Sequence, residues 1–378
     1  MNKLNGNILF AGGGTGGHIY PALATIEALR ERGEFDILYV GGYRGLENKI
    51  VPENGIPFKK IWISGFQRFF TIKNAVFPVK LMVSLLQSWK ILRQFKPLVV
   101  VGTGGYVSGP VVWLAARRGT PTLIQEQDSF PGATTRLLAK IANVICVPYE
   151  GVEGHLSKIA GKVLVAGNPV RKSLQLVDKK TAVKEWNLDP DRPVIFIFGG
   201  SQGAQSINQA ITSLVTGFSG KYGAQVLWQV GSNNYEKVKS SAAAGHPDVR
   251  ILGYINSMNL AYSAADVIVS RAGAITLAEL SHAGKPCVLV PYPFAAANHQ
   301  EHNARTISEA GAALLVKEGE RFVERLKEAV ESILDDQKYA EKLAASWEKV
   351  RKLNAAETIA AEIIDLMQKA KDDSFRKN

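Results

Sequence analysis

The stretch that decides the fold is ILFAGGGTGGH at residues 8–18, and it has a counterpart, VIFIFGGSQGA, at residues 194–204. In each stretch a short apolar run, typical of a buried strand, leads through glycines into a helical pattern. Glycines let the backbone approach a ligand closely, and the N–H groups at the start of a helix attract anions. One such loop is a weak signal, whereas two in matching settings predict two similar domains that face one cleft.

Short strands alternate with helical patterns along most of the chain, which indicates parallel strands with crossover helices. We therefore expect an α/β fold of the GT-B type, with two doubly wound, Rossmann-like domains. The expected strands are residues 7–11, 36–40, 98–102, 122–125, 144–147, 163–166, 194–198, 225–229, 250–253, 267–270 and 286–291.

Three segments divide the expected structure. Asn168-Pro169 breaks regular structure, so we place the domains at residues 1–168 and 169–352. The remaining segment, 353–378, is expected to hold a helix that packs back on the first domain. From Gly319 onward the pattern predicts two amphipathic helices, and the charged residues from Lys369 onward predict a frayed tail.

The overall composition is that of an ordinary globular protein. The 378 residues include 46% apolar and 21% charged side chains, which suits two domains. We see no secretory signal and no apolar run near the roughly 18 residues that a transmembrane helix needs. Cys146 and Cys287 lie in strand-like runs, which predicts buried free thiols. We expect the protein on the cytoplasmic side of the membrane.

The net charge of +11 is unevenly distributed, because residues 54–125 contain ten lysines and arginines and no acidic residue. Such a segment favours an anionic partner. Large apolar side chains stand among the cations, and this mixture suits a membrane interface better than nucleic acid. We therefore predict peripheral contact with an anionic membrane surface through residues 66–96, and no nucleic-acid partner. The alternative is that these apolar groups are core. The apolar residues in question are Phe66, Phe69, Phe70, Ile72, Val76, Phe77, Val79, Leu81 and Met82.

Dinucleotide and metal sites are disfavoured. The first loop satisfies G-x-G-x-x-G, but the second strand carries Asp36 at its beginning and ends in glycines, so the acid that would bind a ribose is missing. Asp189-Pro190-Asp191 has the spelling of a metal-binding pair, yet it precedes a strand on the far side of the sheet, where a turn is expected. We expect no metal and no other cofactor.

His18 lies at the end of the first glycine loop, just inside the expected helix. The helix dipole there favours a neutral imidazole, which can accept a proton. The alternative is a histidine that caps or packs. Because ligands of open α/β sheets bind at the carboxyl ends of the strands, this position favours an active-site role.

A set of short motifs then occurs in order along residues 5–365. The chain resembles the GT-B glycosyltransferases of family 28 that act in peptidoglycan synthesis, and the set is specific although no single motif is. The motifs are Gly14–His18 with Pro21-Ala22, Gly102–Tyr106, Glu126-Gln127, Gly167–Arg171, Gly199–Ala204, Ser270–Ala274 and His299-Gln300.

The resemblance implies an inverting N-acetylglucosaminyltransferase. The donor would be UDP-N-acetylglucosamine. The acceptor would be the muramic acid 4-hydroxyl of lipid I, an undecaprenyl-diphosphate-linked muramoyl-pentapeptide, and the product lipid II. The enzyme would be peripheral, at the cytoplasmic face of the cell membrane.

The resemblance also implies site residues. His18 and Glu126 are the candidates for deprotonating the acceptor, with bulk solvent left open as a third route. Ser201 and Arg171 would hold the diphosphate, the backbone of Ile255 the uracil, Glu279 the ribose and Gln300 a sugar hydroxyl. Alternatives are a turn cap for Glu126, a solvated helix charge for Glu279 and an ordinary polar loop residue for Gln300. The full expected substrate-binding set is Thr15, Gly16, Gly17, Tyr106, Asp128, Arg171, Ser201, Gln202, Ile255, Ala274, Glu279 and Gln300.

Asp128 departs from the family, which commonly has an amide at this position. An ionised carboxylate only accepts hydrogen bonds, whereas an amide also donates them. Asp128 could accept a sugar hydroxyl, be partly protonated, or lie away from the substrate. Competing functions for the chain are another GT-B glycolipid glycosyltransferase, a UDP-sugar epimerase, a non-catalytic UDP-sugar sensor and an NAD-dependent oxidoreductase.

Overall fold

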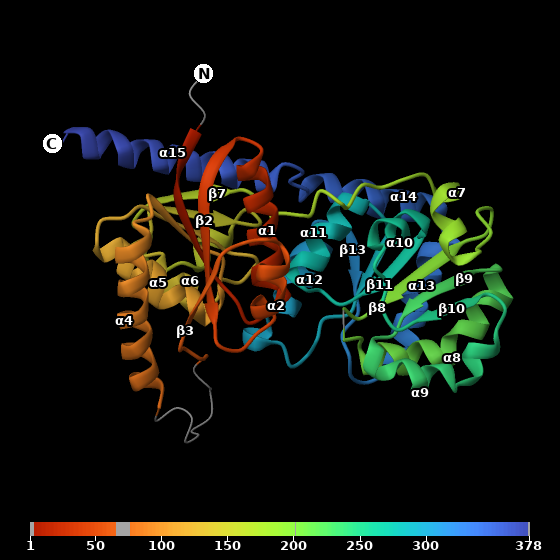
Figure 1. The fold of residues 1–378 in the computed structure, drawn as a ribbon. Helices are drawn as coiled ribbons and strands as arrows, with labels where there is room; N and C mark the ends of the chain where they lie inside the picture. The colour runs from red at the N-terminus through yellow and green to blue at the C-terminus, as the bar shows by residue number, and fades with distance from the viewer. Residues whose placement is uncertain (1–3, 66–75, 201, 377–378) are drawn as a thin grey trace. The chain divides into compact units, whose positions relative to one another are not determined.

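A computed structural model describes residues 4–65, 76–200 and 202–376. The chain forms two compact units (Figure 1). Unit 1 comprises the chain up to Arg171 together with the chain from Lys352 onward, and unit 2 comprises Lys172–Arg351. Ser201 and four of the apolar residues expected at a membrane, Phe66, Phe69, Phe70 and Ile72, lie outside the described residues.

Unit 1 contains a parallel sheet with the strand order β3-β2-β1-β4-β5-β6-β7. All six strands expected in this half are present, and β3 is additional. Because the glycine loop at residues 12–17 follows the end of β1, an inner strand between β2 and β4, it lies at the carboxyl edge of the sheet. The strands are β1 Leu4–Ala11, β2 Gly33–Gly42, β3 Phe58–Ile61, β4 Val99–Gly102, β5 Thr122–Gln125, β6 Val144–Val147 and β7 Lys162–Val165.

Helices cover both faces of this sheet because the strand side chains alternate. Ile8 and Phe10 point into a core shared with α1 and α15, whereas Leu9 and Ala11 point into a core shared with α4 and α5. Both faces are apolar, as expected for a doubly wound parallel sheet. The helices of unit 1 are α1 Gly16–Arg30, α2 Glu47–Glu53, α4 Phe77–Phe95, α5 Gly105–Arg117, α6 Ala133–Leu138 and α15 Ala355–Arg376, with a short 3₁₀ turn at Val152–His155.

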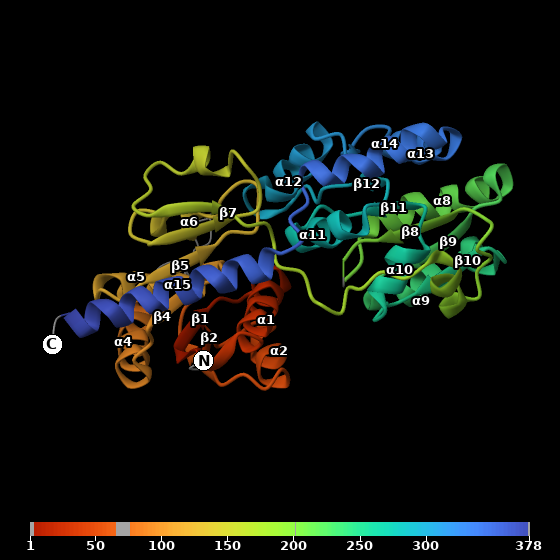
Figure 2. The ribbon, with the colours of Figure 1, turned by 90° about the horizontal axis from the view of Figure 1, so that it is seen from above.

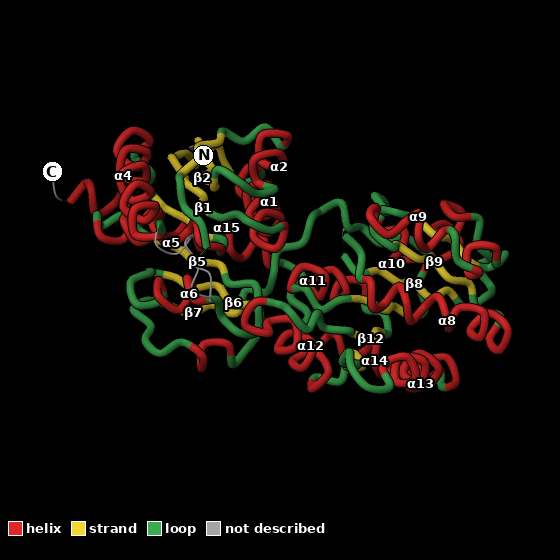
Figure 3. Tube along the Cα trace, turned by 90° about the horizontal axis from the view of Figure 1, so that it is seen from below, coloured by secondary structure: helices red, strands yellow, loops and turns green. Residues whose placement is uncertain are grey.

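Unit 2 repeats the scheme with the strand order β10-β9-β8-β11-β12-β13, again parallel. Its strands are β8 Val194–Phe198, β9 Gln225–Gln229, β10 Val249–Leu252, β11 Val267–Ser270, β12 Cys287–Leu289 and β13 Ala313–Leu315. In Figure 3 these strands lie between helices. The helices are α7 Lys179–Ala182, α8 Gln205–Tyr222, α9 Tyr235–Lys239, α10 Met258–Ala264, α11 Ala274–Ala283, α12 His299–Glu309, α13 Phe322–Asp335 and α14 Gln337–Ser346.

The C-terminal segment differs from the expectation. Three helices follow Gly319 rather than two, and the expected frayed tail is helical as far as Arg376. α15 packs on α1 (Figure 2). It adds Ile359, Ile363 and Met367 to the core of unit 1. Its last turns are tied down, because the Lys371 ammonium donates to the backbone carbonyl of Asn5 at 2.8 Å. The charge of the tail suggested fraying, whereas the tail continues a helix whose preceding turns pack apolar side chains into the core of unit 1.

Candidate functional site

The glycine loop of unit 1 is built so that its backbone faces outward from the carboxyl end of β1. Gly14 has φ +92°, a conformation that favours glycine. Thr15 is the N-cap residue of α1, but its side chain makes no capping hydrogen bond. The first backbone N–H groups of the helix, from Gly16 and Gly17 onward, are therefore not occupied by a capping side chain. The loop therefore offers backbone donors at a helix start.

His18 is held against this loop by a short hydrogen bond. Its Nδ1 lies 2.8 Å from the backbone carbonyl of Gly13. Because a carbonyl only accepts, the hydrogen-bond network assigns the ring proton to Nδ1, and Nε2 of the neutral ring carries the lone pair. In this tautomer, Nε2 of His18 is the atom that can accept a proton, as the sequence predicts for this position.

A second glycine turn packs against the imidazole. Gly104 and Gly105 follow β4 and have φ +100° and +75°. A Cβ on Gly104 would lie 2.5 Å from Cδ2 of His18, and one on Gly105 would lie 2.4 Å from the Gly13 carbonyl oxygen. Both glycines are therefore required for this close approach, which fixes the orientation of the His18 ring.

Glu126 is buried behind this edge and holds a loop together. Its Oε1 accepts the backbone N–H groups of Gln127 and Asp128, at 2.9 and 3.0 Å, and its Oε2 accepts that of Gly132 at 3.0 Å. Burial raises the pKa of the Glu126 carboxyl, with a further increase from the nearby Asp128 charge, while these hydrogen bonds act in the opposite direction. The contacts are those of the turn cap, the alternative that the sequence left open.

A buried amide network joins the neighbouring strand ends. The side chain of Gln127 donates to the carbonyl of Thr103 at 2.8 Å, and the side chain of Asn168 donates to the carbonyl of Gln127 at 2.8 Å. Gln125 donates to the side-chain oxygen of Asn168 at 3.2 Å. These amides connect the segments after β4, β5 and β7, and sequence reasoning quoted two of them in motifs without assigning them this role.

The other expected residues of unit 1 lie along the same edge. The ring of Tyr106, near the start of α5, lies 3.6 Å from the position of a Cβ on Gly14, and burial followed by the Glu47 charge raises the pKa of its hydroxyl. Asp128 follows β5 and is half-buried. The exposed Arg171 places its guanidinium 5.6 Å from the ring centroid of Tyr20 in α1.

Unit 2 carries a pocket of about 750 Å³ at the carboxyl ends of its strands. The second glycine loop forms one wall, and the starts of α8 and α11 open into it. Gly203 is indispensable to the loop, because its φ is +75° and a Cβ there would lie 1.9 Å from the carbonyl oxygen of Val230. Of the expected residues, Gln202 and Gln300 line the pocket, and Ala274 is the first residue of α11.

Arg271 organises this pocket and was not singled out from the sequence. Its buried guanidinium forms an ion pair with Glu318, donates to the carbonyl of Val290 at 3.1 Å and donates to the Ser206 hydroxyl at 3.0 Å. It therefore joins the start of α8 to the segments after β12 and β13. The only sequence signal was its place in the turn after β11.

The structure gives contacts within unit 2 for three residues that are expected to bind the nucleotide sugar. Glu279 is 8% exposed and its carboxylate accepts from the Tyr262 hydroxyl at 2.9 Å, so the solvated-charge alternative is wrong. The backbone N–H of Ile255 donates to Gln229 Oε1 at 2.8 Å. Gln300 accepts the backbone N–H of Tyr292 at 2.9 Å, so its side-chain amide nitrogen is the group directed elsewhere.

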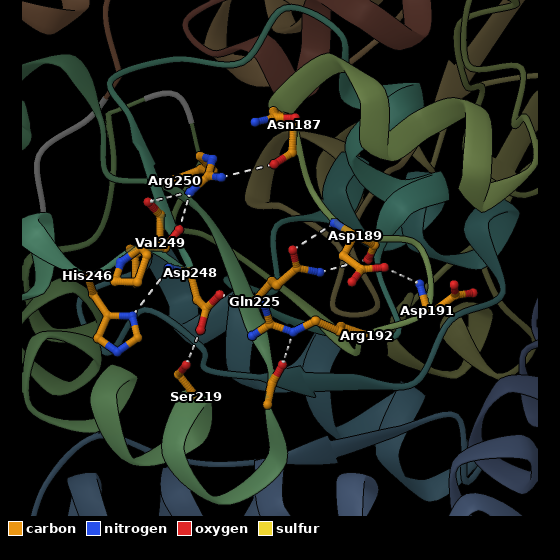
Figure 4. Close-up of polar contacts among 12 residues, drawn as sticks. Asn187, Asp189, Asp191, Arg192, Ser219, Gln225, His246, Asp248, Val249 and Arg250 are labelled. Carbon is orange, nitrogen blue, oxygen red and sulfur yellow. Dashed lines mark hydrogen bonds and ion pairs between the residues drawn. The ribbon is translucent and has the colours of Figure 1, made fainter.

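The Asp189-Pro190-Asp191 segment forms the expected turn (Figure 4). Asp189 accepts the backbone N–H of Asp191 at 2.9 Å, just before β8 and thus at the amino end of the sheet. Arg192 beside it pairs with Asp248 at 2.7 Å. Among the described residues, no cluster of three or more His, Cys, Asp or Glu side chains is arranged to hold a metal ion.

Comparisons with known proteins place both units in one family. The model of the glycosyltransferase family 28 N-terminal domain matches residues 8–147, and that of the family 28 C-terminal domain matches residues 194–363. The chain belongs to glycosyltransferase family 28. The family 28 N-terminal match lies within unit 1, and the C-terminal match covers most of unit 2 and continues into α15.

Family 28 relatives match over nearly their whole length. A protein of Christiangramia forsetii, named UDP-N-acetylglucosamine–N-acetylmuramyl-(pentapeptide) pyrophosphoryl-undecaprenol N-acetylglucosamine transferase, is 42% identical over 95% of this chain and 97% of its own. A protein of the same name from Flavobacterium psychrophilum is 42% identical over 96% and 98%. The crystal structure of Acinetobacter baumannii MurG is 27% identical, with a TM-score of 0.77 over 96% of this chain and 99% of its own.

Proposed function

We propose that this protein transfers N-acetylglucosamine from UDP-N-acetylglucosamine to the muramic acid 4-hydroxyl of lipid I, forming lipid II with inversion. The observation that carries the proposal is the full-length similarity to relatives named for this transfer. The two glycine loops, each at a strand end and a helix start, suit the two substrates that the reaction needs.

His18 is proposed as the base. Its Nδ1 proton is held by Gly13, so Nε2 is the atom that takes the proton of the acceptor hydroxyl. As that oxygen forms its bond to the anomeric carbon, the bond from this carbon to the diphosphate oxygen breaks on the opposite face, which inverts the anomeric centre. UDP leaves with the electron pair. For Glu126 the three backbone hydrogen bonds support a role in shaping the loop after β5.

The pocket of unit 2 is proposed to hold the donor. The helix starts at Gln205 and Ala274 present backbone N–H groups, which suit a diphosphate and stabilise the charge that grows on it during departure. Glu279 is proposed to accept ribose hydroxyls, the Ile255 carbonyl to accept from uracil, and Gln300 to contact the sugar. Arg171 supplies a permanent charge for the phosphates.

The outer face of α4 is proposed to lie on the anionic, cytoplasmic surface of the membrane. Val79, Met82, Leu86 and Trp89 are exposed and recur at helical spacing along one stripe. Lys90 and Arg93 flank the stripe, and Arg93 lies 5.2 Å from the centroid of the Trp89 ring. Exposed apolar residues bordered by cations suit interfacial binding. No described helix has the length and apolar character needed to cross a bilayer.

Radiolabelled transfer tests the function. Wild-type protein is incubated with UDP-N-[¹⁴C]acetylglucosamine and a lipid I analogue, and His18→Ala is assayed in parallel. The control variant is His246→Ala, because His246 lies at the end of the unit 2 sheet opposite to the pocket. We expect transfer by wild type and control, and a loss of at least about 100-fold in kcat for His18→Ala. Conversion of the donor to an epimer without transfer, or donor binding without turnover, would overturn the proposal.

A further inference from the structure

Glu47 is a fully buried carboxylate under the first glycine loop, and it belongs neither to the proposed catalytic residues nor to the proposed substrate-binding residues. It is the first residue of α2, and its side chain reaches back toward the ends of β1 and β2. Oε2 accepts the backbone N–H of Gly14 at 3.0 Å, and Oε1 accepts the backbone N–H of Gly42 at 3.1 Å. Acceptance by both oxygens is the pattern of an ionised carboxylate.

The surrounding backbone is shaped to admit this carboxylate. A Cβ on Gly13 would lie 2.4 Å from Oε1, one on Gly45 would lie 2.2 Å from Oε2, and one on Gly41 would lie 2.7 Å from Cγ. Three glycines are therefore needed for the chain to close around one side chain: Gly13 in the loop after β1, Gly41 near the end of β2 and Gly45 in the loop after β2. Burying a charge in this way is costly unless its hydrogen bonds are well formed.

One peptide group connects Glu47 to His18. The N–H that Glu47 accepts and the carbonyl that His18 contacts belong to the same Gly13–Gly14 peptide. The N–H and C=O of a trans peptide point in opposite directions, so the carboxylate and the imidazole lie on opposite sides of it. We infer that Glu47 is the positioning carboxylate of His18 and acts through this peptide group.

The physical effect follows from polarisation along the chain of hydrogen bonds. A carboxylate that accepts the Gly14 N–H draws this proton toward itself and increases the negative charge on the Gly13 carbonyl oxygen. That oxygen then holds the Nδ1 proton more firmly, which keeps Nε2 as the proton acceptor. The relay thus performs, across one peptide, what a direct carboxylate–imidazole contact performs in hydrolytic triads.

A neutral replacement cannot reproduce this arrangement. Glutamine in place of Glu47 has one acceptor oxygen, so its NH₂ group would face a backbone N–H at either Gly14 or Gly42. The charge of Glu47 also reaches its neighbours, because it contributes to raising the pKa of Tyr39 and Tyr106, after the larger effect of burial. Further ionisable groups along this edge include Arg44 after β2, Glu126 and Asp128 after β5, and Arg171 after β7.

A double-mutant cycle tests the inference, which rests on the proposed base role of His18. Glu47→Gln is compared with Glu53→Gln, an exposed glutamate of the same helix, in wild-type and His18→Ala backgrounds. We expect Glu47→Gln to lower kcat by about 10- to 100-fold, as loss of a supporting partner does elsewhere, with the donor KM within about twofold of wild type. In the His18→Ala background, Glu47→Gln should lower kcat by less than about twofold. Glu53→Gln should change neither value.

A second measurement does not depend on the fold of any variant. The ¹⁵N chemical shifts of the His18 ring in wild-type protein should report the Nδ1-protonated tautomer. Predominance of the Nε2-protonated tautomer, an unchanged kcat in Glu47→Gln, or an equal loss in both backgrounds would overturn the inference. Failure of wild type to transfer sugar would instead overturn the proposed function, and the ring shifts would still test the Nδ1-protonated tautomer that the link to Glu47 requires.

Discussion

The side-chain oxygen of Gln229 accepts the backbone N–H of Ile255 at 2.8 Å. The amide nitrogen of the same side chain donates to the carbonyl of Gly200 at 3.1 Å. One buried side chain at the end of β9 therefore joins the proposed diphosphate loop to the segment proposed to read uracil. The distance between these two segments is therefore set within unit 2 before the donor binds.

Replacing Gln229 with methionine should weaken donor binding. The change keeps the length of the side chain but leaves the Gly200 carbonyl and the Ile255 N–H without this partner, which costs about 1–3 kcal/mol where such groups are buried. We expect the KM for UDP-N-acetylglucosamine to rise about tenfold and kcat to change little. Gln337→Met, at an exposed position in α14, is the matched control. An unchanged KM in a folded Gln229→Met protein would show that the two segments are positioned independently.

Glu126→Gln should separate the loop-shaping role from a base role. An amide nitrogen cannot accept the N–H of Gly132, so the loop after β5 loses a hydrogen bond and the free energy of unfolding should fall by about 1–2 kcal/mol. If Glu126 shapes the loop, the KM for the acceptor should rise together with this loss. A large drop in kcat with an unchanged thermal midpoint would instead favour Glu126 as the base.

Asp248 should make the stability of unit 2 depend on acid pH. Hydrogen bonds from Arg192 and then Ser219 hold the pKa of the Asp248 carboxyl at about 2, below the roughly 3.9 of an unfolded chain. Because the folded pKa is the lower one, the ionised form favours folding, and this stabilisation is lost as the pH falls from about 4 to about 2. Asp248→Asn should cost about 1 kcal/mol at pH 7, allowing for solvent screening.

Denaturant titrations at a series of pH values check the direction in which the free energy of unfolding changes with pH. The difference between wild type and Asp248→Asn should shrink below pH 4, while the exposed control Asp191→Asn should stay near wild type throughout. A difference that grows on acidification would contradict the assignment.

Met82→Ser and Leu86→Ser should weaken membrane binding without destabilising unit 1. These side chains are 67% and 66% exposed on α4, so the folded protein loses little packing when they are removed. We expect the double variant to sediment less with anionic liposomes and to retain its activity on a water-soluble acceptor. Leu353→Ser, a change at another exposed leucine of unit 1, should leave liposome binding intact. A lowered melting temperature would show that the stripe is core.

The sequence predicted the strands best where they are buried on both faces. β5, β6, β8, β9 and β11 have the expected bounds, because an uninterrupted apolar run between turn residues has few other interpretations. β3 at the edge of its sheet carries two exposed lysines, and β13 has only three residues. Neither leaves a periodic signal, because an edge strand is partly solvated and a short one completes no pattern.

The sequence singled out His18 but neither Glu47 nor Arg271, although Arg271 lies within the Ser270–Ala274 motif. His18 follows directly from the glycine loop. Glu47 and Arg271 do not, because a charged residue near a turn is expected to be solvated, and only tertiary structure shows that glycines close around Glu47 or that Arg271 joins three segments. Burial of a charge is not encoded in its neighbours along the chain.

The place of α15 has a consequence for how the protein is made. Ile359, Ile363 and Met367 belong to the core of unit 1, yet they leave the ribosome after all of unit 2. Unit 2 lies wholly between Lys172 and Arg351, so all of its strands and helices emerge before that core can close. Since domains fold as units during synthesis, unit 2 is free to fold while the earlier half of the chain still waits for its final helix. In a nascent chain, the unit proposed to bind the donor nucleotide would mature before the unit that carries His18.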